Sequence, residues 1–189
     1  MPPQTIRTAI LTNSSIKERL SGATMIQFHH PLFLRQAAHH LSHLRIDRPF
    51  LAVHIRTERV VRDGMKLKFG LQYSQHCIQL LEVLTDKLMK LFALKQVVIV
   101  TDSSHNAGSD SCQFEGTRCK YSHWNSFLSF LNGSHLMKHR IEYQGEGELK
   151  THSGYVSLVE CNMLALGSKL VLVGHGAFQN MVEGAFLNH

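Results

Sequence analysis

Three short apolar runs, each followed at once by polar side chains, constrain the fold of this chain most. They lie in the expected strands at residues 50–56, 96–100 and 169–173, the first of which is apolar up to Val53 and ends on His54 and Arg56. Each run has the length of a buried strand. Between them lie longer stretches whose apolar residues recur every three or four positions, as in amphipathic helices. Strands that alternate with helices are typical of a parallel sheet, so we expect an α/β fold, a Rossmann-like parallel sheet with helices on both faces.

The same periodicity predicts the positions of the helices and loops and the bounds of the folded domain. Helices are expected at residues 31–45, 73–92, 124–131, 155–166 and 177–187. We interpret residues 57–71 as a polar loop with its turn at Asp63-Gly64, and residues 103–120 as a long loop. Short strands are expected at 25–28 and 140–143. Residues 1–24 form an N-terminal tail or a truncated remainder, and residues 25–189 form one domain.

Charge and hydropathy narrow the classes of partner. The formal net charge of +6 favours anionic partners. The basic residues are scattered and are not interleaved with aromatic residues, so no nucleic-acid partner is expected. No apolar run approaches the roughly 18 residues of a membrane span. The first residues do not resemble a signal peptide, so the chain is either cytosolic or lacks its targeting segment.

Cysteines and histidines give no clear metal or nucleophile signature. Cys77 and Cys161 fall within apolar helical patterns and are expected in the core, whereas Cys112 and Cys119 would pair only in an oxidising compartment. The 14 histidines include a pair one helical turn apart, His39 and His43, a spacing that zinc sites use. The sequence offers no clear third ligand, and a polar helix face explains the spacing of His39 and His43 equally well. We therefore expect no metal.

Polar residues at the ends of the three strands are the candidate site. His54 and Arg56 end the first strand, Asp102 the second, and Gly174-His175-Gly176 the third. Carboxyl ends of parallel strands share one edge of a sheet, where ligands bind. The guanidinium of arginine suits phosphate oxygens, and glycines before a helix let backbone N–H groups approach phosphate. The same glycines also serve in a tight turn without a ligand. Glu160, on the preceding helix, has two readings, a guanine acceptor or a solvated helix residue.

These segments resemble the motifs of the GDP-fucose-dependent fucosyltransferases, the protein O-fucosyltransferases and their α1,6 and α1,2 relatives. Phe50-Leu-Ala-Val-His-Ile-Arg looks like their H-x-R motif, and Val97-Val-Ile-Val-Thr-Asp-Ser is similar to their second motif. Leu158-Val-Glu-Cys-Asn-Met-Leu, followed by Ser168-Lys-Leu-Val-Leu-Val-Gly-His-Gly-Ala-Phe, resembles the third. All three occur in the family's order, and the likeness covers roughly residues 25–183.

The resemblance implies the C-terminal, nucleotide-sugar lobe of a GT-B glycosyltransferase. It implies transfer of fucose from GDP-fucose, with inversion, to a hydroxyl of a protein or glycan, without a metal cofactor. Such a protein works in the lumen of the endoplasmic reticulum or Golgi when an upstream signal or anchor directs it there. Arg56 would hold the β-phosphate and stabilise the leaving group. The implied GDP-fucose contacts are His54, Arg56, Asp102, Glu160, Gly176, Ala177 and Phe178.

Three departures from the family pattern keep alternatives open. The family turn usually has serine where Gly176 and Ala177 stand, some members have a second arginine where Thr57 stands, and residues 1–24 are too few for the N-terminal acceptor lobe. A non-catalytic nucleotide-sugar or glycan-binding remnant is therefore one alternative. A basic α/β module that associates with nucleic acid is another.

Overall fold

A parallel sheet forms the centre of the protein. The computed structural model describes residues 9–11, 31–66, 70–102, 113–114, 117–118, 121–145 and 153–187. The strand order is β1-β6-β2-β3; β2 is parallel to both neighbours, and β1 pairs antiparallel with β6. The strands are β1 (Ala9–Leu11), β2 (Phe50–Ile55), β3 (Gln96–Thr101) and β6 (Lys169–Val173). A separate pair consists of β4 (Gln113–Phe114) and β5 (Thr117–Arg118).

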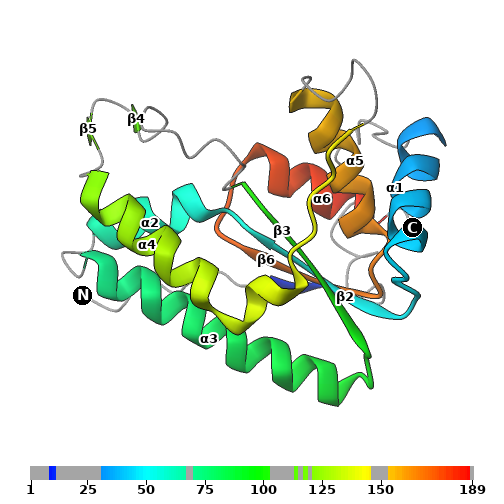
Figure 1. Ribbon diagram of the computed structural model, residues 1–189, viewed down its shortest axis with the longest axis horizontal. Coiled ribbons are helices and arrows are strands. Elements are labelled where there is room, and N and C mark those ends of the chain that lie inside the picture. Colours follow the sequence, from blue (N-terminus) through cyan, green and yellow to red (C-terminus); the bar gives the residue numbers. More distant parts are fainter. Residues whose placement is uncertain are drawn as a thin grey trace, which may run out of the picture.

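Helices cover both faces of this sheet, as Figure 1 shows. One face carries α2, α3, α4 and the 3-10 helix η1, and the other carries α1, α5 and α6. Their bounds are α1 (Pro31–His43), α2 (Thr57–Lys66), α3 (Gly70–Leu91), α4 (Tyr121–Gly133), η1 (His135–His139), α5 (Ser153–Ala165) and α6 (Ala177–Leu187). The expected Rossmann-like α/β fold is confirmed.

Burial of β2 on both faces explains why its sequence is a continuous apolar run. Successive side chains of a strand point to opposite faces. Leu51 and Val53 pack against α3 and α4, whereas Phe50 and Ala52 pack against α1 and α5. All six residues of β2 are buried. Polar side chains are therefore excluded from the strand itself, apart from His54, and gather beyond its carboxyl end.

The prediction of a polar loop at residues 57–71 is wrong, because residues 57–66 form α2. Val60 and Val61 are buried against the α3 side of the core. Gly64 is not a turn residue. A Cβ at this position would lie 2.6 Å from Ser74 Oγ and 2.7 Å from Gly70 O. Glycine is therefore required because α2 and α3 approach closely.

Other expectations differ in their bounds. The helix expected at residues 124–131 spans residues 121–133, and Ala9–Leu11, within the expected tail, belong to the sheet. The segment expected as a strand at residues 140–143 joins the edge of β3 by one parallel bridge, Ile99 to Arg140. Within the expected loop 103–120, two short strands pair. The strand expected at 25–28 and the cysteine pair Cys112 and Cys119 lie outside the described residues.

Two further expectations concern the core and the membrane. Cys77 and Cys161 are buried free thiols, and burial raises the pKa of Cys77 to about 11 and of Cys161 to about 12. They are therefore core residues, as expected. Within the described ranges, no helix combines the length and apolar character that crossing a membrane requires.

The close contact at Gly64 gives a stability prediction. Gly64→Ala should lower the free energy of unfolding by about 1–3 kcal/mol, because overpacking outweighs the gain in helix propensity. Gly154→Ala is the matched control, since a Cβ at this exposed position of α5 meets nothing within 4 Å. Urea denaturation of both variants measures the effect. Equal stability of Gly64→Ala and the wild type would refute the packing role.

Candidate functional site

Arg56 stands at the junction of the three strands. It follows β2 directly, and its N–H donates to Val173 O at 2.9 Å, which extends the pairing of β2 with β6. Its side chain then crosses to the turn after β6, where Nη1 donates to His175 O at 2.9 Å. The side chain keeps 30% of its surface exposed. A ligand at the carboxyl edge of the sheet can therefore reach the guanidinium.

Glycine at the turn after β6 makes room for this guanidinium. A Cβ on Gly176 would overlap Arg56 Nη1 and lie 2.6 Å from Cζ. Gly174 has φ +98°, which favours glycine, and a Cβ there would lie 3.1 Å from Arg56 Cβ. A serine at position 176 would not fit here while Arg56 holds this position. Gln179 Nε2 fixes the turn from the helix side by donating to Val173 O at 2.8 Å.

Asp102, at the end of β3, binds the first residue of α2. Its Oδ1 accepts hydrogen bonds from Thr57 N, at 2.6 Å, and from the Thr57 hydroxyl. Burial raises the pKa of Asp102, and the hydrogen bonds from Thr57 oppose that rise. The carboxylate thus satisfies one of the N–H groups that a helix start leaves open. Asp102 thereby holds the first residue of α2 against the end of β3.

Two carboxylates flank the guanidinium of Arg56. Asp102 Oδ2 lies 4.0 Å from Nε, and Glu58 Oε2 lies 3.9 Å from Nη2. These distances are long for direct hydrogen bonds, so the donors keep capacity for another acceptor. The N-terminus of α6 also lies at this edge, and its first residue, Ala177, is exposed. An anion held there would meet both Arg56 and the first N–H groups of α6.

His54 lies beneath this edge and is only 2% exposed. Its ring packs on Phe178, the second residue of α6, with 4.8 Å between ring centroids. Burial, and secondarily the charge of Arg56, lower its pKa to about 3. Within the described part of the chain its Nδ1 has no hydrogen-bond partner. His54 is therefore neutral and supports Phe178 from inside the core.

Glu160 belongs to a second group of residues, on α5 and the segment along β3. The backbone N–H of Tyr143 hydrogen-bonds its carboxylate. Burial raises the pKa of Glu160 to about 7, and the charge of Glu142 adds to the rise while that of Arg140 opposes it. The bridge from Ile99 to Arg140 is parallel, so Tyr143 lies toward the carboxyl end of β3. Glu160 is therefore a partly buried carboxyl group that ionises near neutral pH.

The structure adds Arg59 and Glu58 to the site, both of which the loop interpretation of residues 57–71 missed. A Cβ on Gly174 would lie 3.3 Å from Arg59 Cβ, so Arg59 adjoins the same turn, and its Nε bonds Asp63 Oδ2 at 3.2 Å. A signal was present in the sequence. Thr57 followed by Glu58 is a typical helix start, and buried Val60 and Val61 continue it.

No group of three or more His, Cys, Asp or Glu that could hold a metal ion occurs among the residues that the structure describes. Comparison with protein-family models, with curated proteins and with solved structures finds no significant match. The fold and the residues at its edge define a Rossmann-like α/β protein with an arginine between the carboxyl ends of three strands.

The neutral state of His54 gives a pH prediction. Its folded pKa of about 3 lies below the unfolded value of 6.5, so the unfolded chain takes up a proton first and stability falls as pH drops from 6.5 toward 3. Between pH 7.5 and 5, wild-type protein should lose about 2 kcal/mol relative to His54→Gln. Urea denaturation at both pH values measures this, with exposed His39→Gln as the control. Parallel pH profiles for wild type and His54→Gln would contradict the prediction.

Proposed function

We propose that this protein binds GDP-fucose at the carboxyl edge of its sheet and serves as the donor lobe of a fucosyltransferase. The proposal joins the sequence resemblance to one observation of the structure: the guanidinium of Arg56 rests against Gly176, directly before α6. Arg56 supplies a charged fork, and the start of α6 supplies backbone N–H groups. Both favour a diphosphate over a neutral ligand.

In the proposed reaction Arg56 acts on the leaving group. When the glycosidic C–O bond to the β-phosphate breaks, negative charge grows on the phosphate oxygens of GDP. The guanidinium of Arg56 stabilises that charge more in the transition state than in the ground state, which accelerates transfer. Gly176, Ala177 and Phe178 bring the backbone of the turn against the phosphate and ribose. The acceptor is a hydroxyl of a protein or glycan, whose oxygen forms the new C–O bond to the anomeric carbon from the opposite face, with inversion, and whose proton passes to solvent.

Glu160 and Asp102 have different proposed roles. An ionised Glu160 accepts the N1–H and N2–H groups of guanine, because a carboxylate has acceptor capacity beyond its bond from Tyr143. Asp102 positions α2 through Thr57 and lies 4.0 Å from Arg56 Nε, so it orients the guanidinium. His54 supports the aromatic ring of Phe178.

Binding of a nucleotide sugar without transfer is the second candidate. Two carboxylates near Arg56, those of Asp102 and Glu58, favour this candidate. They offset part of the positive charge of Arg56 that would stabilise the leaving phosphate. The two candidates differ in turnover. Saturable binding of GDP-fucose together with release of GDP in the presence of glycoprotein supports the transferase, and binding alone supports the second candidate.

Arg56 carries the first test of the proposed site. Arg56→Ala should weaken GDP binding by about 10-fold to 100-fold, as expected for the loss of charge-assisted hydrogen bonds to phosphate. Arg35→Ala, which removes an exposed cation from α1, is the matched control and should leave the affinity unchanged. Isothermal titration calorimetry with GDP measures both. Unchanged affinity in Arg56→Ala would place the phosphates elsewhere.

Glu160 carries the test of base recognition. Its pKa of about 7 means that the carboxylate must lose a proton to accept both guanine donors, so GDP affinity should rise as pH increases from 6 to 8. In Glu160→Gln this rise should shrink. The preference for GDP over IDP, which lacks the 2-amino group, should also shrink. Titrations of both nucleotides at both pH values check this. An undiminished preference for GDP in Glu160→Gln would remove Glu160 from the base site while leaving the role of Arg56 intact.

A further inference from the structure

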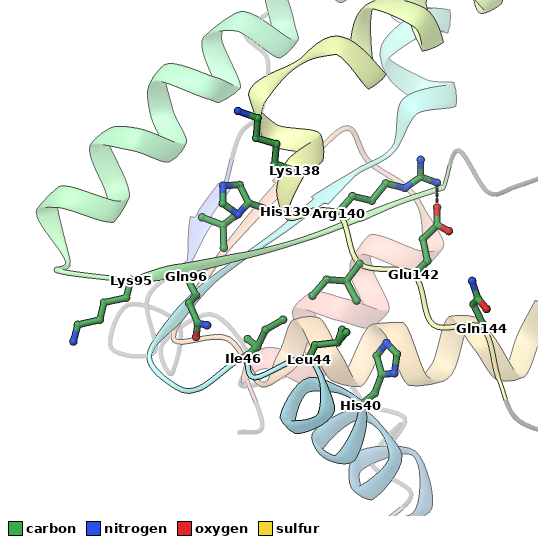
Figure 2. A pocket seen from close by; sticks show the side chains of 12 residues that line it. His40, Leu44, Ile46, Lys95, Gln96, Lys138, His139, Arg140, Glu142 and Gln144 are labelled. Atoms are coloured by element: carbon green, nitrogen blue, oxygen red, sulfur yellow. Dashed lines mark ion pairs between the residues drawn. The ribbon is translucent and has the colours of Figure 1, made fainter.

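A cavity of about 540 Å³ lies beside the first part of β3. It is therefore at the amino-end edge of the parallel strands, whereas Arg56 lies at their carboxyl-end edge. Small-molecule sites typically measure about 300–1,000 Å³. Figure 2 shows Leu44 and Ile46 on the α1 side of the cavity and Lys138 and His139 on the opposite side. The lining residues come from the end of α1, the start of β3 and the segment after α4: His40, Leu44, Ile46, Lys95, Gln96, Val97, Lys138, His139, Arg140, Ile141, Glu142 and Gln144.

Hydrogen bonds and ring contacts fix the walls of this cavity. The amide of Gln96 donates to Arg45 O and accepts from Asp47 N, both at 2.8 Å, which holds the loop after α1 against β3. On the other wall, Ile141 N donates to Ile99 O at 2.9 Å. The ring of His40 meets that of Tyr143 edge-on, with 5.2 Å between centroids, and so links the two walls. The cavity is therefore formed before any ligand binds.

The charge of the lining is positive. Lys95, Lys138 and Arg140 face a single carboxylate, Glu142, which pairs with Arg140 at 2.5 Å. The two lysines make no ion pair within the described part of the chain, and Lys138 Nζ lies 3.1 Å from His135 Nδ1. In Figure 2 both lysine side chains extend outward, away from the other labelled residues that line the cavity. Long lysine stems let the amino groups turn toward an anion at the mouth.

Apolar surface accompanies this charge. Leu44 is 43% exposed although it is a large apolar side chain, and Ile46 and Ile141 continue the apolar lining. Inorganic phosphate would use only the cationic rim and leave this surface in water. A ligand with an apolar body and an anionic head would satisfy both parts of the lining.

We propose that this cavity is a second binding site, which takes a small organic anion with an apolar body and a carboxylate or phosphate head. The apolar body lies against Leu44, Ile46 and Ile141, and the head meets Lys95 and Lys138. The site shares no lining residue with the Arg56 group, but two of its lining residues, Arg140 and Glu142, also act on Glu160, the proposed guanine contact. Either proposal can fail without the other.

The first test uses the dye 8-anilinonaphthalene-1-sulfonate, an apolar anion whose fluorescence rises in apolar sites. The wild-type protein should bind it saturably. Lys95→Gln with Lys138→Gln should weaken this binding by about tenfold, because the head loses both charged partners. Lys87→Gln with Lys90→Gln removes the same charge from the exposed surface of α3 and should change the affinity less than about twofold.

A second pair of variants tests the apolar part. Leu44→Glu should weaken dye binding by about tenfold, whereas Leu32→Glu, at a residue of α1 with the similar exposure of 45%, should not. N-phenyl-1-naphthylamine carries the same rings without the sulfonate. Its binding should fall in Leu44→Glu and stay unchanged in the Lys95/Lys138 double variant, which isolates the role of charge.

Competition identifies the anionic head. Displacement of the dye by octanoate supports a carboxylate ligand, and displacement by phenyl phosphate supports a phosphate ligand. Four outcomes overturn the proposal: no saturable binding of the dye, equal affinities in the cavity variants and their controls, displacement by neither compound, or displacement by GDP in Glu160→Gln. That variant lacks the proposed base contact beside the cavity, so competition by GDP there would place the dye at the Arg56 edge.

Discussion

The position of β2 between β3 and β6 determines where polar chemistry can occur in this protein. Both faces of β2 are covered by helices, and both edges are paired, so all six of its residues are buried. The first side chain that can reach solvent is that of Arg56. The register then brings Asp102 from β3 and the Gly174–Gly176 turn from β6 to the same edge. His54 is buried in the same way. Side chains alternate between the two faces of β2, and that of His54 lies on the face covered by α6.

Packing around the guanidinium of Arg56 explains why glycine, and not serine, stands at position 176. A serine there would bring a neutral hydroxyl donor to the turn. Glycine leaves that space to Arg56 Nη1, so a charged donor lies beside the start of α6. Charge-assisted hydrogen bonds are roughly twice as strong as neutral ones, so this arrangement suits the proposed phosphate site.

Sequence reasoning succeeded where a pattern depends on local periodicity and failed where it depends on tertiary contact. The strands expected over residues 96–100 and 169–173 are apolar runs whose burial is nearly uniform. The helix over 177–187 instead buries one side only, through Gln179, Val182, Ala185 and Phe186. The Asp63-Gly64 pair, typical of turns, predicts a loop over residues 57–71, yet residues 57–66 form α2 and Gly64 is needed for the approach of α3. The bond from Thr57 to Asp102 joins residues 45 positions apart, so no local pattern predicts it. The cavity beside β3 likewise depends on α1 and η1 meeting across a strand edge.

Two buried titratable groups act on stability in opposite directions. His54 has a folded pKa of about 3, below its unfolded value, so acid favours the unfolded chain. Glu160 has a folded pKa of about 7, above its ordinary value of 4.5, so between pH 7 and 4.5 the folded chain takes up the proton and acid favours folding. Across the shared window from pH 6.5 to 4.5 the two contributions oppose each other. A nearly flat pH profile of the wild type would therefore hide two large contributions, and replacing Glu160 would expose the acid sensitivity that His54 causes. A ligand that binds only ionised Glu160 would remove the acid-stabilising contribution alone and leave that of His54 in place.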